Sequence, residues 1–391
     1  MTDHTHPTAL VPRAGVGRIE RALTRRRSVL TALASTAALT ACGGSDGASG
    51  SGATPDGTIE DSLNVYNWAD YDDPDNLAAF EASGPRLQVD SYASNEEMIA
   101  KLVAANGASG YDIVVPTGLF VPQMAQNGLI QAIDHSRLTN YGNLDPAYLG
   151  RSWDPGNEHS IPKSWGTTGF VYDNTVITRP LTSWADFLDA AQREASGNTS
   201  ILEDPWEVMC IWFAANGVDP NTTDETQIAA ARDGLVAGLA PHLKGFESNP
   251  GSSAIAQSTF ALMQCWNGDA RLGIDASDDP DKWTFVFPTP TANLWIDNWC
   301  ITAGAEHPDA AYAFIDFMLQ EENSVREVLY LGYPTAVRGI GAAAEAAGLD
   351  RAELVFPDES IVDRLTVSVL NEGHQATVEA VAAIRAAAGN G

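Results

Sequence analysis

Basic residues are scarce in this chain of 391 residues. Only 22 are lysine or arginine, and four of these are lysine, against 51 aspartate and glutamate residues. Residues 1–41 hold six of the arginines and two of the acids, so residues 42–391 carry 16 basic and 49 acidic residues and a formal charge of −33. Because neutralisation of phosphates requires a basic surface, this balance excludes nucleic acid as a partner.

Cysteine is also rare, and the four residues Cys42, Cys210, Cys265 and Cys300 lie far apart. No Cys-x-x-Cys pair and no Cys/His cluster occurs, so we expect no metal site and no cofactor. If Cys42 is used as described below, the other three allow at most one internal disulfide. We expect them to be buried as small hydrophobic side chains.

Long apolar runs are absent, and the run at residues 28–41 is too short to span a membrane. Arginines 25–27 precede it, and it ends in Leu39-Thr40-Ala41, with Cys42 directly after. This order predicts a secretory signal peptide over residues 1–41. The arginines resemble a twin-arginine signal, and the last four residues resemble a bacterial lipobox, which implies lipidation of Cys42. The alternative is an apolar helix followed by a chance cysteine.

Lipidation would anchor the mature protein outside the cytoplasmic membrane, in the periplasm or at the cell surface. Residues 43–60 are rich in Gly, Ser and polar residues, which together with Cys42 predicts a flexible linker over residues 42–60. The remaining chain is long for one hydrophobic core and suits two lobes.

From residue 61 onward, short apolar strands alternate with helical patterns. Strands are expected at 63–68, 87–90, 111–116, 170–172 and 198–202, and helices at 75–81, 96–106, 184–195, 207–216 and 308–320. This alternation predicts an α/β fold with parallel sheets covered on both faces. Ligands of such sheets bind beyond the carboxyl ends of the strands, which here are residues 68–71 and 117–120.

Three segments place aromatic rings beside acids: 67–71 (NWADY), 204–207 (DPWE) and 295–297 (WID). A desolvated organic cation needs carboxylates for its ammonium groups and aromatic faces along its chain. The same patterns also occur at ordinary strand ends. At 204–207 the order Asp, Pro, x, Glu also predicts a helix N-cap, which competes with a ligand for the same oxygens.

The order of motifs resembles the bacterial spermidine/putrescine-binding proteins, the extracellular receptors of polyamine ABC transporters. The resemblance runs from about residue 61 to 340 and rests on VYNWADY (65–71), SYASNEEMIAKL (91–102), YDIVVP (111–116), SIPKSWGTTG (160–169), CWNG (265–268), LWID (294–297) and LGYPT (331–335). It implies a two-lobed periplasmic-binding-protein ("flytrap") fold, type II-like, with the ligand in the interlobe cleft.

The resemblance also implies site residues and domain limits. The residues implied to bind the ligand are Trp68, Asp70, Tyr71, Thr117, Asp204, Glu207, Trp266, Trp295, Asp297 and Tyr333. Leu119 stands where the family usually has a tyrosine, and Asp70 where a glutamate is common. We expect one lobe from residues 61–168 plus 298–341 and the other from residues 169–297 plus 342–391.

The resulting hypothesis is a monomeric substrate-binding protein of an ABC importer that captures putrescine or spermidine and delivers it to the permease. Alternatives are a receptor for another small cationic amine and a polyamine sensor. A hydrolase that pairs Asp204, Glu207 or Asp297 as acid and base belongs to another class. No nucleophile elbow or other catalytic motif supports it, so we expect no enzyme.

Overall fold

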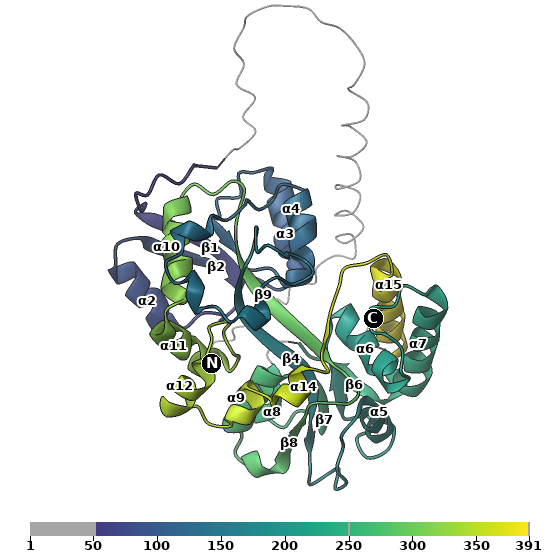
Figure 1. The fold of residues 1–391 in the computed structure, drawn as a ribbon. Coiled ribbons are helices and arrows are strands. Elements are labelled where there is room, and N and C mark those ends of the chain that lie inside the picture. Colours follow the sequence, from purple (N-terminus) through teal and green to yellow (C-terminus); the bar gives the residue numbers. More distant parts are fainter. Residues whose placement is uncertain (1–51, 249–250, 390–391) are drawn as a thin grey trace, which may run out of the picture.

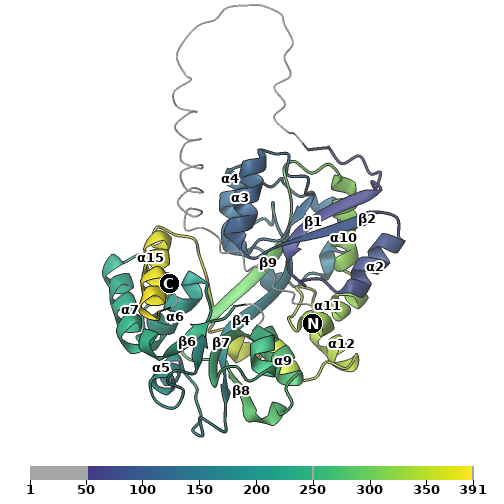
Figure 2. The same ribbon diagram turned by 180° about the vertical axis from the view of Figure 1, so that it is seen from behind.

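The computed structural model describes residues 52–248 and 251–389. The predicted signal peptide, Cys42 and the first part of the linker lie outside the described residues. Figures 1 and 2 show two lobes joined by two long strands, β4 (Ile161–Asp173) and β9 (Asn293–Ile301). Within the described residues, no helix is long and apolar enough to cross a membrane.

The strands form one hydrogen-bonded path in the order β2-β1-β3-β9-β4-β7-β5-β6, with β8 beside β4 and β10 beside β9. The remaining strands are β1 (Ser62–Trp68), β2 (Arg86–Tyr92), β3 (Ile113–Val114), β5 (Thr199–Ile201), β6 (Leu243–Phe246), β7 (Leu262–Trp266), β8 (Trp283–Val286) and β10 (Thr366–Val367). The helices are α2 (Pro74–Ala82), α3 (Asn95–Ala105), α4 (Val121–Gln126), α5 (Trp184–Gln192), α6 (Pro205–Ala215), α7 (Glu225–Gly238), α8 (Gly251–Ala256), α9 (Asn267–Asp275), α10 (Pro308–Met318), α11 (Glu321–Leu331), α12 (Ile340–Ala346), α13 (Ala352–Val355), α14 (Glu359–Val362) and α15 (His374–Ala387).

The prediction of purely parallel sheets is wrong. β1 pairs with β2 and β3 in parallel, and so does β5 with β6 and β7. However, β9 runs antiparallel to β3 and β4, and β4 runs antiparallel to β7 and β8. The two long strands pass from one lobe to the other, so each sheet gains antiparallel neighbours from them.

The apolar residues gather in separate cores on the two sides of this crossing. One core joins Leu63 and Ile113 to Phe314 and Val355. Another core, in the second lobe, contains Phe170, Phe187, Met209 and Ile384 among its buried residues. Cys210, Cys265 and Cys300 are all buried and unpaired, as free thiols.

Residues 52–60, expected as part of a flexible linker, are hydrogen-bonded to the first lobe. Asp56 N and Gly57 N donate to the two carboxylate oxygens of Asp309, at 2.7 and 3.0 Å. Glu60 accepts from Ala310 N at 2.7 Å, at the start of α10. We call residues 52–60 the N-terminal strap, since it is bound along the first lobe before β1 begins.

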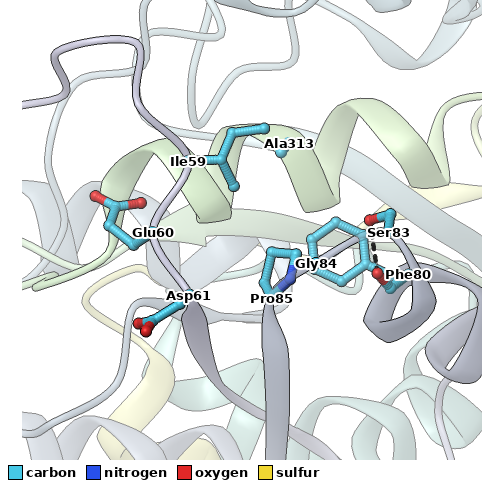
Figure 3. A pocket seen from close by; sticks show the side chains of 8 residues that line it. All are labelled: Ile59, Glu60, Asp61, Phe80, Ser83, Gly84, Pro85 and Ala313. Carbon is cyan, nitrogen blue, oxygen red and sulfur yellow. Dashed lines mark hydrogen bonds between the residues drawn. The ribbon is translucent and has the colours of Figure 1, made fainter.

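A pocket of about 240 Å³ lies beside the strap (Figure 3). Ile59, Glu60 and Asp61 line it from the strap side, facing Phe80 and Pro85. None of the predicted ligand-binding residues lines this pocket.

Candidate functional site

Asp297 on β9 gathers two other predicted site residues around it. Its Oδ1 accepts a hydrogen bond from Thr117 Oγ1 at 2.7 Å, and its Oδ2 accepts one from the Tyr71 hydroxyl at 3.0 Å. Tyr71 follows β1 and Thr117 follows β3, so both lie beyond the carboxyl ends of parallel strands. The segments 68–71 and 117–120 therefore lie where the strand order predicts a binding site.

Asp297 is 7% exposed. Burial raises its pKa to about 6, against the opposing effects of the Thr117 and Tyr71 hydrogen bonds and of the positive charge of Lys163. Burial disfavours the ionised form. A cationic group beside Asp297 would therefore be stabilising.

Glu207 forms a second buried carboxyl group, at the start of α6. Its Oε1 accepts from Thr168 Oγ1 and from Asn293 Nδ2, both at 2.7 Å. Burial and the charge of Asp204 raise its pKa to about 8. Glu207 Oε2 and Asn293 Oδ1 are both buried without a hydrogen-bond partner among the described residues. Two unsatisfied acceptors on hydrogen-bonded neighbours suit an ammonium group, which has three donors.

The strand β9 carries both Asp297 and Asn293, the hydrogen-bond partner of Glu207, so its geometry gives the approximate distance between the two acidic groups. Asn293, Trp295 and Asp297 alternate along the strand, and alternate residues of a strand share a face. Four residues of strand span about 13 Å. The distance from Asn293 to Asp297 is therefore about 13 Å, with Trp295 between them. Asn293 is hydrogen-bonded to Glu207.

Glycines make room for the aromatic rings of the site. A Cβ on Gly166 would lie 2.2 Å from Trp295, and one on Gly268 would lie 2.4 Å from Tyr333. The Trp295 and Tyr333 rings meet edge to face with centroids 5.0 Å apart. The glycine of the CWNG motif thus allows the ring of Tyr333 to lie on the first turn of α9.

Two other predicted aromatic residues lie at strand ends. Trp68 ends β1, donates from its indole nitrogen to Val115 O at 3.0 Å, and packs against Tyr92. Trp266 ends β7, and the proximity of its side chain lowers the pKa of Glu207.

Two predicted acids are exposed, unlike Asp297 and Glu207. Asp204 is exposed and caps α6, accepting from Glu207 N at 3.0 Å, as the capping interpretation predicts. Asp70 is exposed with a φ of 52°, in the left-handed region. Among the described residues, no hydrogen bond joins Asp70 to the other predicted site residues.

Asp269 and Trp153 belong to the site region but were not predicted. Tyr333 OH accepts from Asp269 N at 3.3 Å, and burial followed by the charge of Glu247 raises the pKa of the Asp269 carboxyl group to about 7. Trp153 lies against Gly118 and shares a cluster with Leu119. An indole from a distant loop therefore lies beside the segment that lacks the family's tyrosine.

The described residues contain no group of three or more His, Cys, Asp or Glu side chains placed to hold a metal ion. Residues 77–349 match the family model of the bacterial extracellular solute-binding proteins. The chain belongs to this family. It is therefore an extracytoplasmic solute-binding protein.

Individual proteins similar to this chain are also solute-binding proteins. The chain is 32% identical over 310 residues to the spermidine/putrescine-binding periplasmic protein 1 of Haemophilus influenzae, covering 79% of this chain and 84% of the relative. Its structure is similar to that of the spermidine/putrescine ABC transporter substrate-binding protein PotD from Streptococcus pneumoniae, with a TM-score of 0.71, 28% identity, and coverage of 84% and 98%. The Tp0655 (TpPotD) lipoprotein of Treponema pallidum matches with a TM-score of 0.72, 27% identity, and coverage of 84% and 99%. The predicted two-lobed fold is thereby confirmed.

Proposed function

We propose that this chain is the substrate-binding protein of an ABC importer for polyamines. It would hold a linear polyamine between its lobes and deliver it to the permease. The observation that carries the proposal is the pair of buried acidic groups on either side of Trp295. Neither Asp297 nor Glu207 has a lysine, arginine or histidine within ion-pair distance among the described residues. Buried charges are normally paired, so a cation would stabilise the ionised form of each of these acids.

The spacing of the acids favours a long polyamine. A fully extended chain advances about 3.5 Å over three bonds. The five bonds between the putrescine nitrogens therefore span about 6 Å, and the nine between the terminal nitrogens of spermidine about 10–11 Å. Of these two, spermidine comes nearer to the separation of about 13 Å between Asn293 and Asp297. Asp269, whose backbone nitrogen donates to Tyr333, would be a third acid for its third nitrogen.

The aromatic side chains would cover the methylene groups between the nitrogens. Trp295 lies between the two acidic ends on β9, and Tyr333 packs against it at 5.0 Å. Cation–π attraction contributes about 0.5–2 kcal/mol per ring. Closure of the lobes would then be a population shift driven by contacts that only the closed form offers.

We further propose that the protein acts as a monomer, anchored by a lipid at Cys42 after removal of residues 1–41. The relative from Treponema pallidum is described as a lipoprotein, which supports this anchor. For the lobes we propose residues 61–168 plus 298–341 and residues 169–297 plus 342–391. Leu349 and Val355 pack in the core of the first lobe, whereas Leu354 packs against the cluster of Val171 and Met263 in the second, so residues 342–356 contact both proposed lobes.

Calorimetric titration of the purified protein with putrescine, spermidine and spermine tests the proposal, after unfolding and refolding to remove carried-over ligand. We expect spermidine to bind with a Kd of about 1 μM or less, equivalent to about −8 kcal/mol, and more tightly than putrescine. Absence of heat and of a thermal shift with all three would contradict the polyamine class while leaving the fold unaffected. The next ligands to test would then be other small amines.

A further inference from the structure

Three charged side chains, Asp72, Lys163 and Glu327, are buried together beside Tyr71. Lys163 Nζ lies 3.1 Å from Asp72 Oδ1 and 3.3 Å from Glu327 Oε2, and all three side chains are at most 3% exposed. We call these residues the buried triad. Burial of ion pairs costs several kcal/mol per ion, and apolar replacements are often equally stable or more so. Stability alone therefore does not account for the triad.

The acids of the triad hold both ends of the loop between β1 and α2. Asp72 Oδ2 accepts from Asn67 Nδ2 at 2.7 Å. Glu327 Oε1 accepts from Asp73 N at 2.8 Å and from Asn76 Nδ2 at 2.9 Å. This loop carries Tyr71, so the triad attaches a proposed ligand-binding residue to β4 and α11.

Lys163 also contacts Tyr71 directly. Its Nζ lies 4.5 Å from the centroid of the Tyr71 ring and 4.8 Å from that of Trp299. A cation within about 6 Å of the centroid of an aromatic ring is attracted to the face of the ring by a cation–π interaction. On its other side, Tyr71 donates its hydroxyl hydrogen to Asp297. A continuous line of contacts thus runs from Lys163 through Tyr71 to Asp297.

A buried ammonium behind the site would repel a cationic ligand if it were alone. Here two carboxylates face one ammonium, so the triad has no net positive charge at neutral pH when its members are ionised. The arrangement provides a fixed contact for Tyr71 without opposing the charge of a polyamine.

We propose that Lys163, held between Asp72 and Glu327, is a positioning residue for polyamine binding. It orients Tyr71 so that the Tyr71 hydroxyl is already bonded to Asp297 when the ligand arrives. This inference rests on the proposed function. It assigns a role in affinity to a side chain that does not touch the ligand.

The test replaces the triad by neutral residues of similar shape in the variant Asp72→Asn/Lys163→Met/Glu327→Gln. The amide oxygens can still accept the bonds from Asn67, Asp73 and Asn76, so we expect a folded protein. Its affinity for spermidine should fall by about tenfold or more, within the range for residues in contact. The thermal unfolding temperature should stay close to that of the original protein.

A second measurement separates positioning from a general structural effect. If Lys163 acts through Tyr71, the triple replacement should change affinity by less than about twofold in a Tyr71→Phe background, because the coupling is then already lost. A purely structural role predicts the same loss in both backgrounds. Should the triple variant not fold, the same pair of titrations is made with Lys163→Met/Glu327→Gln.

Lys282 offers a matched control. Its Nζ lies 3.2 Å from Asp173 Oδ2 and 4.8 Å from the centroid of the Trp283 ring, so it repeats the ion pair and ring contact away from the proposed site. Lys282→Met/Asp173→Asn should leave spermidine affinity unchanged. Unchanged spermidine affinity in the folded triad variant would overturn the inference about Lys163. In that case, binding of spermidine by the original protein would still support the proposed function. Failure of the original protein to bind any polyamine would overturn the proposed function itself.

Discussion

Tyr71 and Asp297 are joined by a hydrogen bond of 3.0 Å although 226 residues separate them in the chain. The bond connects the loop after β1 to the strand β9, which crosses between the lobes. Substitution of either residue therefore disturbs one shared part of the proposed ligand site.

Replacing Asp297 by asparagine should weaken spermidine binding by about 30-fold or more, since loss of one partner of a buried charged pair costs about 2–5 kcal/mol. Removal of the buried charge should leave the unliganded protein equally or more stable at pH 8. Titration calorimetry and thermal unfolding measure the two effects. Asp278→Asn, at an exposed acid, is the control for the change in net charge. Retained affinity in Asp297→Asn would remove this residue from the site.

Glu207→Gln should discriminate between polyamines by length. We expect the affinity for spermidine to fall by about 10- to 100-fold, the equivalent of a charge-assisted hydrogen bond of about 1.5–3 kcal/mol. Putrescine, which cannot reach from Asp297 to Glu207, should change by less than about threefold. The measurement is a parallel titration with both amines. Equal losses for both would mean that the two acids do not hold opposite ends of the ligand.

Binding should strengthen as the pH rises from about 5.5 to 8. In the unliganded protein the carboxyl pKa values are about 6 for Asp297, about 7 for Asp269 and about 8 for Glu207. A cationic ligand favours the ionised forms, so binding should release protons over this range. Calorimetry in buffers of different ionisation enthalpy measures the release. Uptake of protons, or none, would contradict the assignment.

The same raised pKa values set the pH dependence of stability without ligand. At pH values between the ordinary carboxyl pKa and these raised pKa values, the folded state binds more protons than the unfolded state. The free energy of unfolding therefore falls as the pH rises through this range. The unliganded protein should thus lose stability from these groups between about pH 4 and 8, and spermidine should offset the loss. Chemical denaturation at several pH values, with and without spermidine, checks both statements.

Gly166→Ala should damage the site without removing any polar group. The new Cβ would overlap the ring of Trp295, and the indole must then move along the face that we assign to the ligand. Affinity for spermidine should fall by about tenfold, and overpacking should cost about 1–3 kcal/mol of stability. Gly245→Ala is the matched control in a strand, because a Cβ there would meet nothing within 4 Å. If both variants bind like the original protein, Trp295 does not line the ligand.

Asp309→Ala should release the N-terminal strap. The variant loses bonds from Asp56 N, Gly57 N and Arg137, so the unfolding temperature should fall by a few degrees. Spermidine affinity should be unchanged, because the strap contacts none of the proposed ligand residues. A protein starting at Asp61 should show the same effect. Equal stability would mean that the strap is not bound in solution.

The apolar strands and the ends of the parallel strands could be predicted from the sequence, since Val65 belongs to an alternating pattern and Ile113 to a short apolar run. The full length of β4 could not. Only residues 170–172 carry the apolar strand pattern. Lys163, Ser164 and Thr168 are polar, yet they are buried because each finds a partner from a distant segment.

Asp269 was missed for a different reason. The preceding pair Asn267-Gly268 reads as a turn, but Asn267 begins α9 and its side chain bonds Thr167 N and Leu354 O. Only the packing of Tyr333 against Gly268 makes the neighbouring Asp269 part of the site. The role of Asp204 as a helix cap was predictable, whereas its exposure depends on tertiary structure.

The N-terminal strap also limits how the protein can stand on a membrane. If the lipid is on Cys42, only residues 43–51 separate it from the bound strap, and nine residues extend at most about 30 Å. The attachment point on the first lobe, near Ala303 and Ala305, receives Gly52 and Ala53 by backbone hydrogen bonds. The receptor would then pivot about a fixed corner of one lobe, with the second lobe free to swing toward a transporter in the same bilayer.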